Sequence, residues 1–119
     1  MPRRRISDHD GATALAKWRE LGRDTARADL LTATRWTLEE IAALHPGRSV
    51  EIRVPPAGAV QILPGTTHRR GTPPAVIETD AHTWLALATG EVTWEEATNS
   101  GAVDASGERT DLSPYLPFM

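Results

Sequence analysis

Residues 83–107 read TWLALATGEVTWEEATNSGAVDASG, and this stretch decides the fold class. It begins inside a helix, because apolar residues recur at the i, i+3, i+4 and i+7 spacing of one buried helical face: Ala81, Trp84, Leu85 and Ala88. Thr79 or Asp80 is the candidate N-cap of this helix, and Gly90 is its stop signal.

A second, shorter helix and a strand follow within the same stretch. Thr93 and Glu96 have the spacing of a capping box, in which each side chain satisfies a free backbone N–H of the other residue. The helix that they begin is expected to end at residues 99–101. Alternation over residues 102–106 then predicts a strand, and Gly107 turns the chain out of it. Helices and a strand in such close succession indicate an α+β domain.

Three more strands are predicted upstream. The sequence SVEIRV at 49–54 alternates apolar and charged side chains, as in a strand with one wet face. PPAG at 55–58 interrupts it and AVQILP at 59–64 resumes extended structure, so we expect an antiparallel hairpin. A polar loop at 65–74 leads into AVIET at 75–79, which is the third strand.

Two helices are predicted ahead of these strands. Asp8 and Asp10 are the candidate caps of a helix over residues 11–21, which Gly22 ends. A longer helix over residues 26–44 has one apolar stripe and is stopped by a His-Pro-Gly sequence. Near the other end of the chain, a serine before a proline predicts a short helical turn, with Ser113 as its cap and Pro114 in first position.

The length of 119 residues predicts one domain. We divide it into a basic tail at 1–9, helices at 10–45, and a core of sheet and helices at 46–119. A net charge of −3 and a pI near 5.8 argue against nucleic acid as a partner. No apolar run approaches the ~20 residues of a membrane span, and the zero cysteines suit a reducing cytoplasm, which is the location we expect.

The sequence carries no motif for catalysis, for a metal or for a cofactor. Four histidines lie on separate elements without a second ligand at metal-binding spacing: His9, His45, His68 and His82. No serine lies in a Gly-x-Ser-x-Gly elbow, and no glycine-rich phosphate loop occurs. We therefore expect no catalytic residue, no metal and no cofactor.

One polar cluster and four tryptophans have two readings each. His68, Arg69 and Arg70 on the long loop are suited to hold a carboxylate or phosphate, or they form a solvated loop. The tryptophans fall on predicted helices, where core packing is the default and ligand contact is the exception.

The stretch ETDAHTWLALATGEVTWEEATNSGAVDASGERTDL at 78–112 resembles the second half of the sterol carrier protein family. The resemblance lies in a strand, a polar helix cap, a helix with the buried aromatic Trp84, the Gly90 turn and a second helix. It also includes the G-x-V-x-x-S-G pattern that starts at Gly101 and ends at Gly107. It extends over residues 48–116, and the chain is most similar to the short actinobacterial-type orthologs.

The resemblance implies an α+β fold in which helices cover one face of a mostly antiparallel sheet of about five strands. It also implies an apolar tunnel for fatty acids, acyl-CoA esters or sterols, and no catalysis. The side chains expected to line that tunnel are Val60, Ile62, Ile77, Trp84, Leu87, Trp94, Val103 and Leu116. His68, Arg69 and Arg70 are the expected contacts of an anionic head group.

Binding or transfer of an apolar lipid is thus the expected function, with a transient membrane-surface contact left open. An apolar ligand is held by buried area rather than by specific bonds, so the lack of a polar motif agrees with it. The lack of a polar motif agrees equally with the alternative function, a structural or protein-interaction module with a filled core. An enzyme whose site is assembled from distant residues is the third hypothesis, and the oligomeric state stays open.

Overall fold

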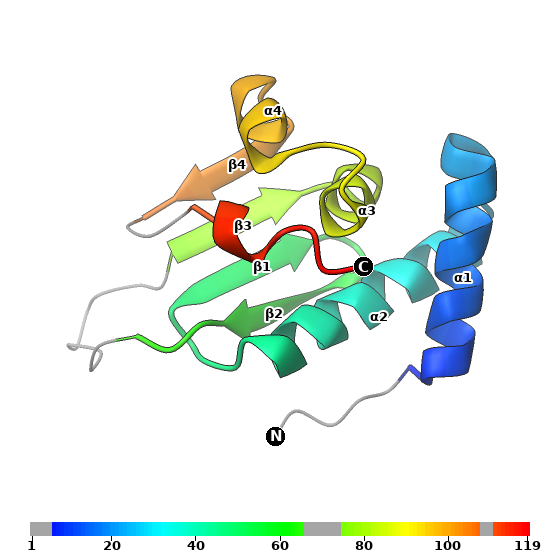
Figure 1. The fold of residues 1–119 in the computed structure, drawn as a ribbon, viewed down its shortest axis with the longest axis horizontal. Coiled ribbons are helices and arrows are strands. Elements are labelled where there is room, and N and C mark those ends of the chain that lie inside the picture. The colour runs from blue at the N-terminus through cyan, green and yellow to red at the C-terminus, as the bar shows by residue number, and fades with distance from the viewer. Residues whose placement is uncertain (1–5, 66–74, 108–110) are drawn as a thin grey trace.

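The structure is a computed structural model that describes residues 6–65, 75–107 and 111–119. Its elements in chain order are α1 (Asp8–Leu21), the 3₁₀ turn η1 (Gly22–Asp24), α2 (Arg27–Leu44), β1 (Val50–Val54), β2 (Gly58–Ile62), β3 (Ala75–Thr79), α3 (Ala81–Thr89), α4 (Trp94–Asn99), β4 (Val103–Ser106) and the 3₁₀ turn η2 (Ser113–Tyr115). Figure 1 shows them as one sheet with helices packed around it, and the predicted α+β class is confirmed.

The sheet is mixed, and its strand order is β2-β1-β3-β4. β1 and β2 form the predicted antiparallel hairpin, in which Val50 lies opposite Ile62. This hairpin returns the chain to the end where β1 begins, so β3 starts with Ala75 opposite Val50 and runs parallel to β1. β4 pairs antiparallel with β3.

The described residues hold four strands, whereas about five were expected. After β4 the described chain continues with residues 111–119, which include Pro114 and Pro117. Proline has no N–H to donate to a ladder, so this stretch is a poor candidate for a fifth strand. It forms η2 and an extended run instead.

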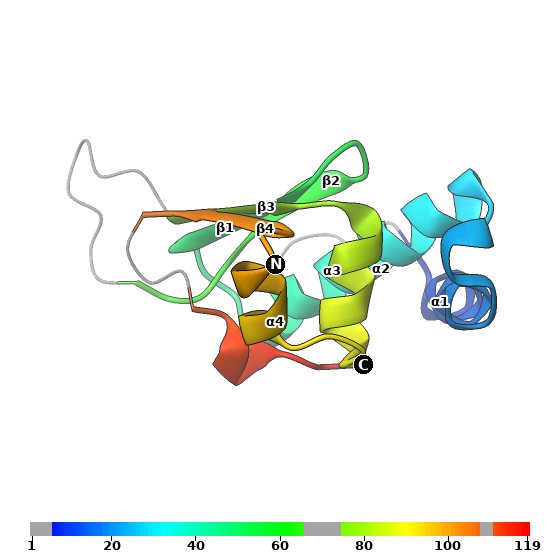
Figure 2. The same cartoon turned by 90° about the horizontal axis from the view of Figure 1, so that it is seen from above.

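Helices α2, α3 and α4 cover one face of the sheet, as expected (Figure 2). On β1, Val50, Ile52 and Val54 are fully buried, whereas Glu51 and Arg53 belong to the opposite face. The Arg53 Nε–H donates to Glu51 Oε1 at 2.7 Å, and this bond, with the charge of the carboxylate, raises the pKa of Arg53. The apolar core therefore lies between the sheet and the helices, and the other face of the sheet is polar.

The caps of α3 and α4 follow from local sequence. Asp80 is the cap of α3, because its Oδ1 accepts the Thr83 N–H at 2.8 Å. The predicted capping box of α4 is confirmed, with Thr93 Oγ1 accepting the Glu96 N–H at 3.1 Å and Glu96 Oε1 accepting the Thr93 N–H at 3.3 Å. Both helices thus begin where the sequence placed them.

Helix α1 begins earlier than predicted, and its cap is different. Ser7 is the N-cap, since its Oγ accepts the Asp10 N–H at 3.1 Å, whereas Asp8 Oδ1 accepts the Trp36 Nε1–H on α2. The helix then packs so closely on α2 that a Cβ at Gly11 would overlap the Trp36 ring. Of the two carboxylates expected to cap the helix, Asp8 therefore bonds α2 instead, and Asp10 lies inside the helix. Among the described residues, no helix is long and apolar enough to cross a membrane.

Candidate functional site

The side chains that were expected to line a tunnel lie in the core or against it. Five of them are buried: Ile62, Ile77, Trp84, Leu87 and Val103. Three are partly buried and pack against the core: Val60, Trp94 and Leu116. None of these eight lines the two surface cavities described below.

Trp84 is the largest side chain at the centre of this core and is 1 % exposed. Its Nε1–H donates to Thr37 Oγ1 on α2 at 2.9 Å, and that hydroxyl donates in turn to the Ala33 carbonyl at 2.8 Å. The polar edge of the indole is therefore satisfied inside the protein, as buried polar groups require. The ring itself contacts Phe118, with ring centroids 5.9 Å apart.

Phe118 belongs to residues 112–119, which we call the covering segment. Both views place the segment on the helix side of the sheet (Figures 1 and 2). It runs from the end of α2 to the end of α3. At the α2 end, the Tyr115 ring packs edge to face against the His45 ring, with ring centroids 4.8 Å apart. There the N–H groups of Phe118 and Met119 both donate to the Ala88 carbonyl at 3.0 Å.

The covering segment is held mainly by apolar contact. Leu112 is fully buried. Four further side chains are partly buried and pack against the core: Tyr115, Leu116, Phe118 and Met119. At its far end, the amides of Phe118 and Met119 share the Ala88 carbonyl as their acceptor, so few backbone hydrogen bonds hold the segment there.

A cavity of about 390 Å³ opens beside the covering segment, at the end of the sheet where β1 begins. We call it the sheet-end cavity, and its lining combines three apolar side chains with three that carry a polar group: Ser49, Val50, Leu63, Pro64, Asp111 and Tyr115. Val50 is 0 % exposed and belongs to the core, so the cavity reaches core residues at its inner side. Tyr115 links it to the covering segment.

Two of the polar side chains of the sheet-end cavity, Ser49 and Asp111, differ in character. Ser49 Oγ is buried and, among the described residues, has no hydrogen-bond partner. Gly65 approaches it so closely that a Cβ there would overlap it. Asp111 Oδ1 accepts the Ser113 N–H at 2.9 Å, and this bond lowers the pKa of Asp111. Asp111 therefore stays an anion near neutral pH. The predicted cap of this turn is one residue off, because Ser113 is the first residue of η2 and Leu112 is its N-cap, without a side-chain cap bond.

The backbone at the cavity is held in an uncommon conformation. Leu63 has φ 69°, in the left-handed region that costs a non-glycine residue roughly 1–2 kcal/mol. It is fixed there from two sides, since its N–H donates to the His45 carbonyl at 2.8 Å and its carbonyl accepts the Ser49 N–H at 3.1 Å. Backbone strain of this kind is more frequent at functional sites than elsewhere.

Several sequence predictions bear on groups that the site does not include. His68, Arg69 and Arg70 lie outside the described residues, although their loop starts directly after Pro64 and Gly65 at the cavity. Within the described ranges, no three histidine, aspartate or glutamate side chains are close enough to hold a metal ion.

Sequence reasoning missed Ser49, Asp111 and Tyr115 as site residues. The available signal was the density of apolar residues in LSPYLPFM at 112–119, a stretch for which the sequence predicts only a short helical turn. Apolar residues in such number are expected to pack against an apolar surface of the domain.

Together, these features define a small α+β domain with one polar sheet face, one helix-covered face and an apolar segment across the helices. A family model described as a bacterial SCP ortholog matches residues 26–118, and the chain belongs to this family. The resemblance to sterol carrier proteins is thereby confirmed. A comparison with curated proteins finds no match. Helix α1 and turn η1 precede the matched residues.

Proposed function

We propose that the protein binds and transfers an apolar lipid, a fatty acid, an acyl-CoA or a sterol-like molecule, without catalysing a reaction on it. The lipid enters at the sheet-end cavity and lies under the covering segment, against Trp84. The observation that carries the proposal is the covering segment itself. Its apolar side chains occupy the helix side of the core, and a lipid tail has the chemistry to take their place.

The expected affinity follows from buried area. An acyl chain that buries about 300 Å² of apolar surface gains about 7.5 kcal/mol at about 25 cal/mol per Å². A micromolar complex corresponds to roughly −8 kcal/mol, so micromolar is the upper limit of affinity for this area, because the apolar contacts that the covering segment gives up are subtracted from the gain. The eight predicted lining residues are the surface that the tail would contact once the covering segment moves.

The head group is expected to stay at the sheet-end cavity. Ser49 Oγ, which is buried and has no hydrogen-bond partner among the described residues, is the proposed donor there, and Asp111 is an acceptor that repels anions. A sterol-like hydroxyl can use both groups. A carboxylate or CoA phosphate needs cations to offset Asp111, and we assign that role to His68, Arg69 and Arg70 on the adjoining loop.

Displacement of a fluorescent fatty acid tests the proposal. Long-chain fatty acids, acyl-CoA esters or sterols should displace it at about micromolar concentration. Replacing Arg69 and Arg70 together by Gln should weaken charged lipids about tenfold and leave a fatty alcohol unchanged, because a partly desolvated ion pair is lost. If no lipid displaces the probe up to its solubility limit, the carrier proposal fails.

A structural or protein-interaction module remains the second candidate, and one observation favours it. Trp84 and its neighbours are packed against one another, so a core without ligand is complete. Native mass spectrometry of the freshly purified protein separates the two candidates. A co-purified lipid mass supports the carrier, whereas an apo mass and a stable protein partner in a pull-down support the module.

A further inference from the structure

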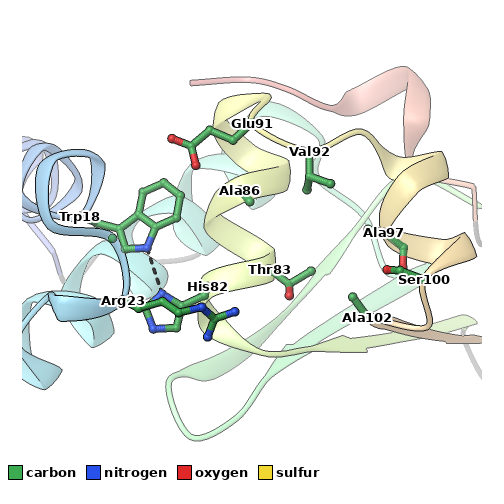
Figure 3. A pocket seen from close by; sticks show the side chains of 11 residues that line it. Trp18, Arg23, His82, Thr83, Ala86, Glu91, Val92, Ala97, Ser100 and Ala102 are labelled. Atoms are coloured by element: carbon green, nitrogen blue, oxygen red, sulfur yellow. Dashed lines mark hydrogen bonds between the residues drawn. The ribbon is translucent and has the colours of Figure 1, made fainter.

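A second cavity, of about 340 Å³, lies on the other side of α3, between α1, η1 and α4 (Figure 3). We call it the α3 groove. It shares no lining residue with the sheet-end cavity. The Trp18 indole forms one wall, and its apolar floor consists of small side chains: Ala86, Val92, Ala97 and Ala102. Its volume is at the lower end of the range for small-molecule sites, and alanine methyls give a floor that suits a flat ring.

The hydrogen bond between Trp18 and His82 fixes the proton of the imidazole. Trp18 Nε1–H donates to His82 Nδ1 at 3.1 Å, so a neutral His82 carries its proton on Nε2. His82 therefore keeps one N–H donor for a ligand. The Trp18 bond also holds the ring in place, because the Trp18 side chain is buried.

Arg23 supplies a cation at the same end of the groove as His82 (Figure 3). Within the described part of the chain, no carboxylate is paired with its guanidinium. Asp80, the nearby cap of α3, directs its two oxygens to the N–H and the hydroxyl of Thr83. Two donors, one of them charged, are thus available for an anion, and charge-assisted bonds of this kind are among the stronger polar contacts.

Glu91 lies at the opposite end of the groove and limits what can bind (Figure 3). His82 is in the first turn of α3, and Glu91 lies two residues beyond its last residue, Thr89. Thr89 is seven steps along the helix from His82, a rise of about 10 Å. A ligand with one anionic group can place it at Arg23 and keep an uncharged body toward Glu91. A second anionic group at the far end would meet a like charge.

We propose that the α3 groove binds a small aryl monocarboxylate. The carboxylate lies at Arg23 and His82, and the flat ring rests on the alanine floor beside Trp18. Glu91 discriminates against dicarboxylates. Trp18 and Arg23 precede residues 26–118, the part that matches the family, so this site combines the family's domain with the helix that precedes it. It does not rest on the lipid-binding proposal.

The test uses the indole N–H signals of the ¹⁵N-labelled protein, with Trp18 assigned through Trp18→Phe. Phenylacetate should shift the Trp18 signal with a dissociation constant of about 1 mM or tighter, and it should leave Trp36 unchanged. Phenylethanol, which lacks the charge, should bind at least about tenfold more weakly. The site is overturned if phenylacetate leaves the Trp18 signal unmoved, or if the alcohol binds equally well.

Two variants and a matched control locate the contacts. Arg23→Gln should weaken phenylacetate about tenfold, whereas Arg19→Gln, an exposed change in the last turn of α1, should not alter it. Glu91→Gln should improve binding of 1,4-phenylenediacetate relative to phenylacetate. Equal losses in the Arg23 and Arg19 variants, or no gain for the dicarboxylate in Glu91→Gln, would contradict the proposed orientation. Failure of lipid to displace a fatty-acid probe leaves all of these results unaffected.

Discussion

Replacing Thr37 by valine should destabilise the protein, because this hydroxyl is the acceptor for the buried Trp84 N–H. Thr37 is 0 % exposed, and its Oγ1 lies 2.9 Å from Trp84 Nε1. Valine has nearly the same shape, so packing is preserved while the acceptor is lost. A buried donor without a partner costs about 1–3 kcal/mol.

The matched control is Thr34→Val, one turn earlier on α2. Thr34 is also 0 % exposed, but its hydroxyl donates to the Leu30 carbonyl at 2.7 Å, and among the described residues no N–H donates to it. Both substitutions exchange the same hydroxyl for the same methyl on the same helix. The difference between their free energies of unfolding therefore isolates the acceptor for Trp84, and we expect it to be at least about 1 kcal/mol.

Urea denaturation followed by circular dichroism measures this difference without relying on tryptophan emission. A Trp84→Phe background completes the cycle, since Thr37→Val should lose most of its cost when the indole N–H is gone. Equal unfolding free energies for Thr37→Val and Thr34→Val would refute the reasoning. The reasoning would also be refuted if Thr37→Val lowered the unfolding free energy by the same amount in the Trp84→Phe background.

Three further predictions follow from named contacts. Gly11→Ala should lower the unfolding free energy by about 2 kcal/mol, because overlap with the Trp36 ring outweighs the roughly 1 kcal/mol gain in helix propensity; a more stable variant in a melting experiment would contradict this packing. Thr93→Ala should cost about 1 kcal/mol, and a denaturation midpoint equal to wild type would remove the capping role. Phe118→Ala should tighten lipid binding about threefold or more in the displacement assay, because less apolar contact with Trp84 has to be given up; weaker binding would show that Phe118 is part of the lipid site.

Much of the fold could be predicted because its signals are local. The cap at Asp80, the capping box at Thr93 and the alternation in β1 each depend on neighbours within a few residues. The parallel pairing of β3 with β1 depends instead on where a hairpin and a long loop return the chain, which no short pattern records. The start of α1 was misplaced because Asp8, a good cap by residue type, is engaged by Trp36 from another helix.

The candidate site was less predictable, for a physical reason. An apolar side chain such as Trp84 or Ile77 has the same sequence pattern whether it faces a ligand or a neighbour, because both environments are dry. The Ser49 hydroxyl, which has no partner among the described residues, and the contact of Phe118 with Trp84 both depend on segments far apart in the chain. The sequence identified the family and the apolar character of the expected lining residues, whereas the three-dimensional arrangement identified the covering segment.

The most direct test of lipid binding under the covering segment is paramagnetic attenuation of the indole N–H signals by a spin-labelled stearic acid. Trp84 lies beneath the segment, whereas Trp36 donates to Asp8 on α1 and serves as the internal reference. The account predicts that the Trp84 signal is attenuated at about micromolar ligand while the Trp36 signal persists, and that unlabelled stearic acid restores it. Equal attenuation of both signals, or none at Trp84 at saturating ligand, would contradict the proposed site.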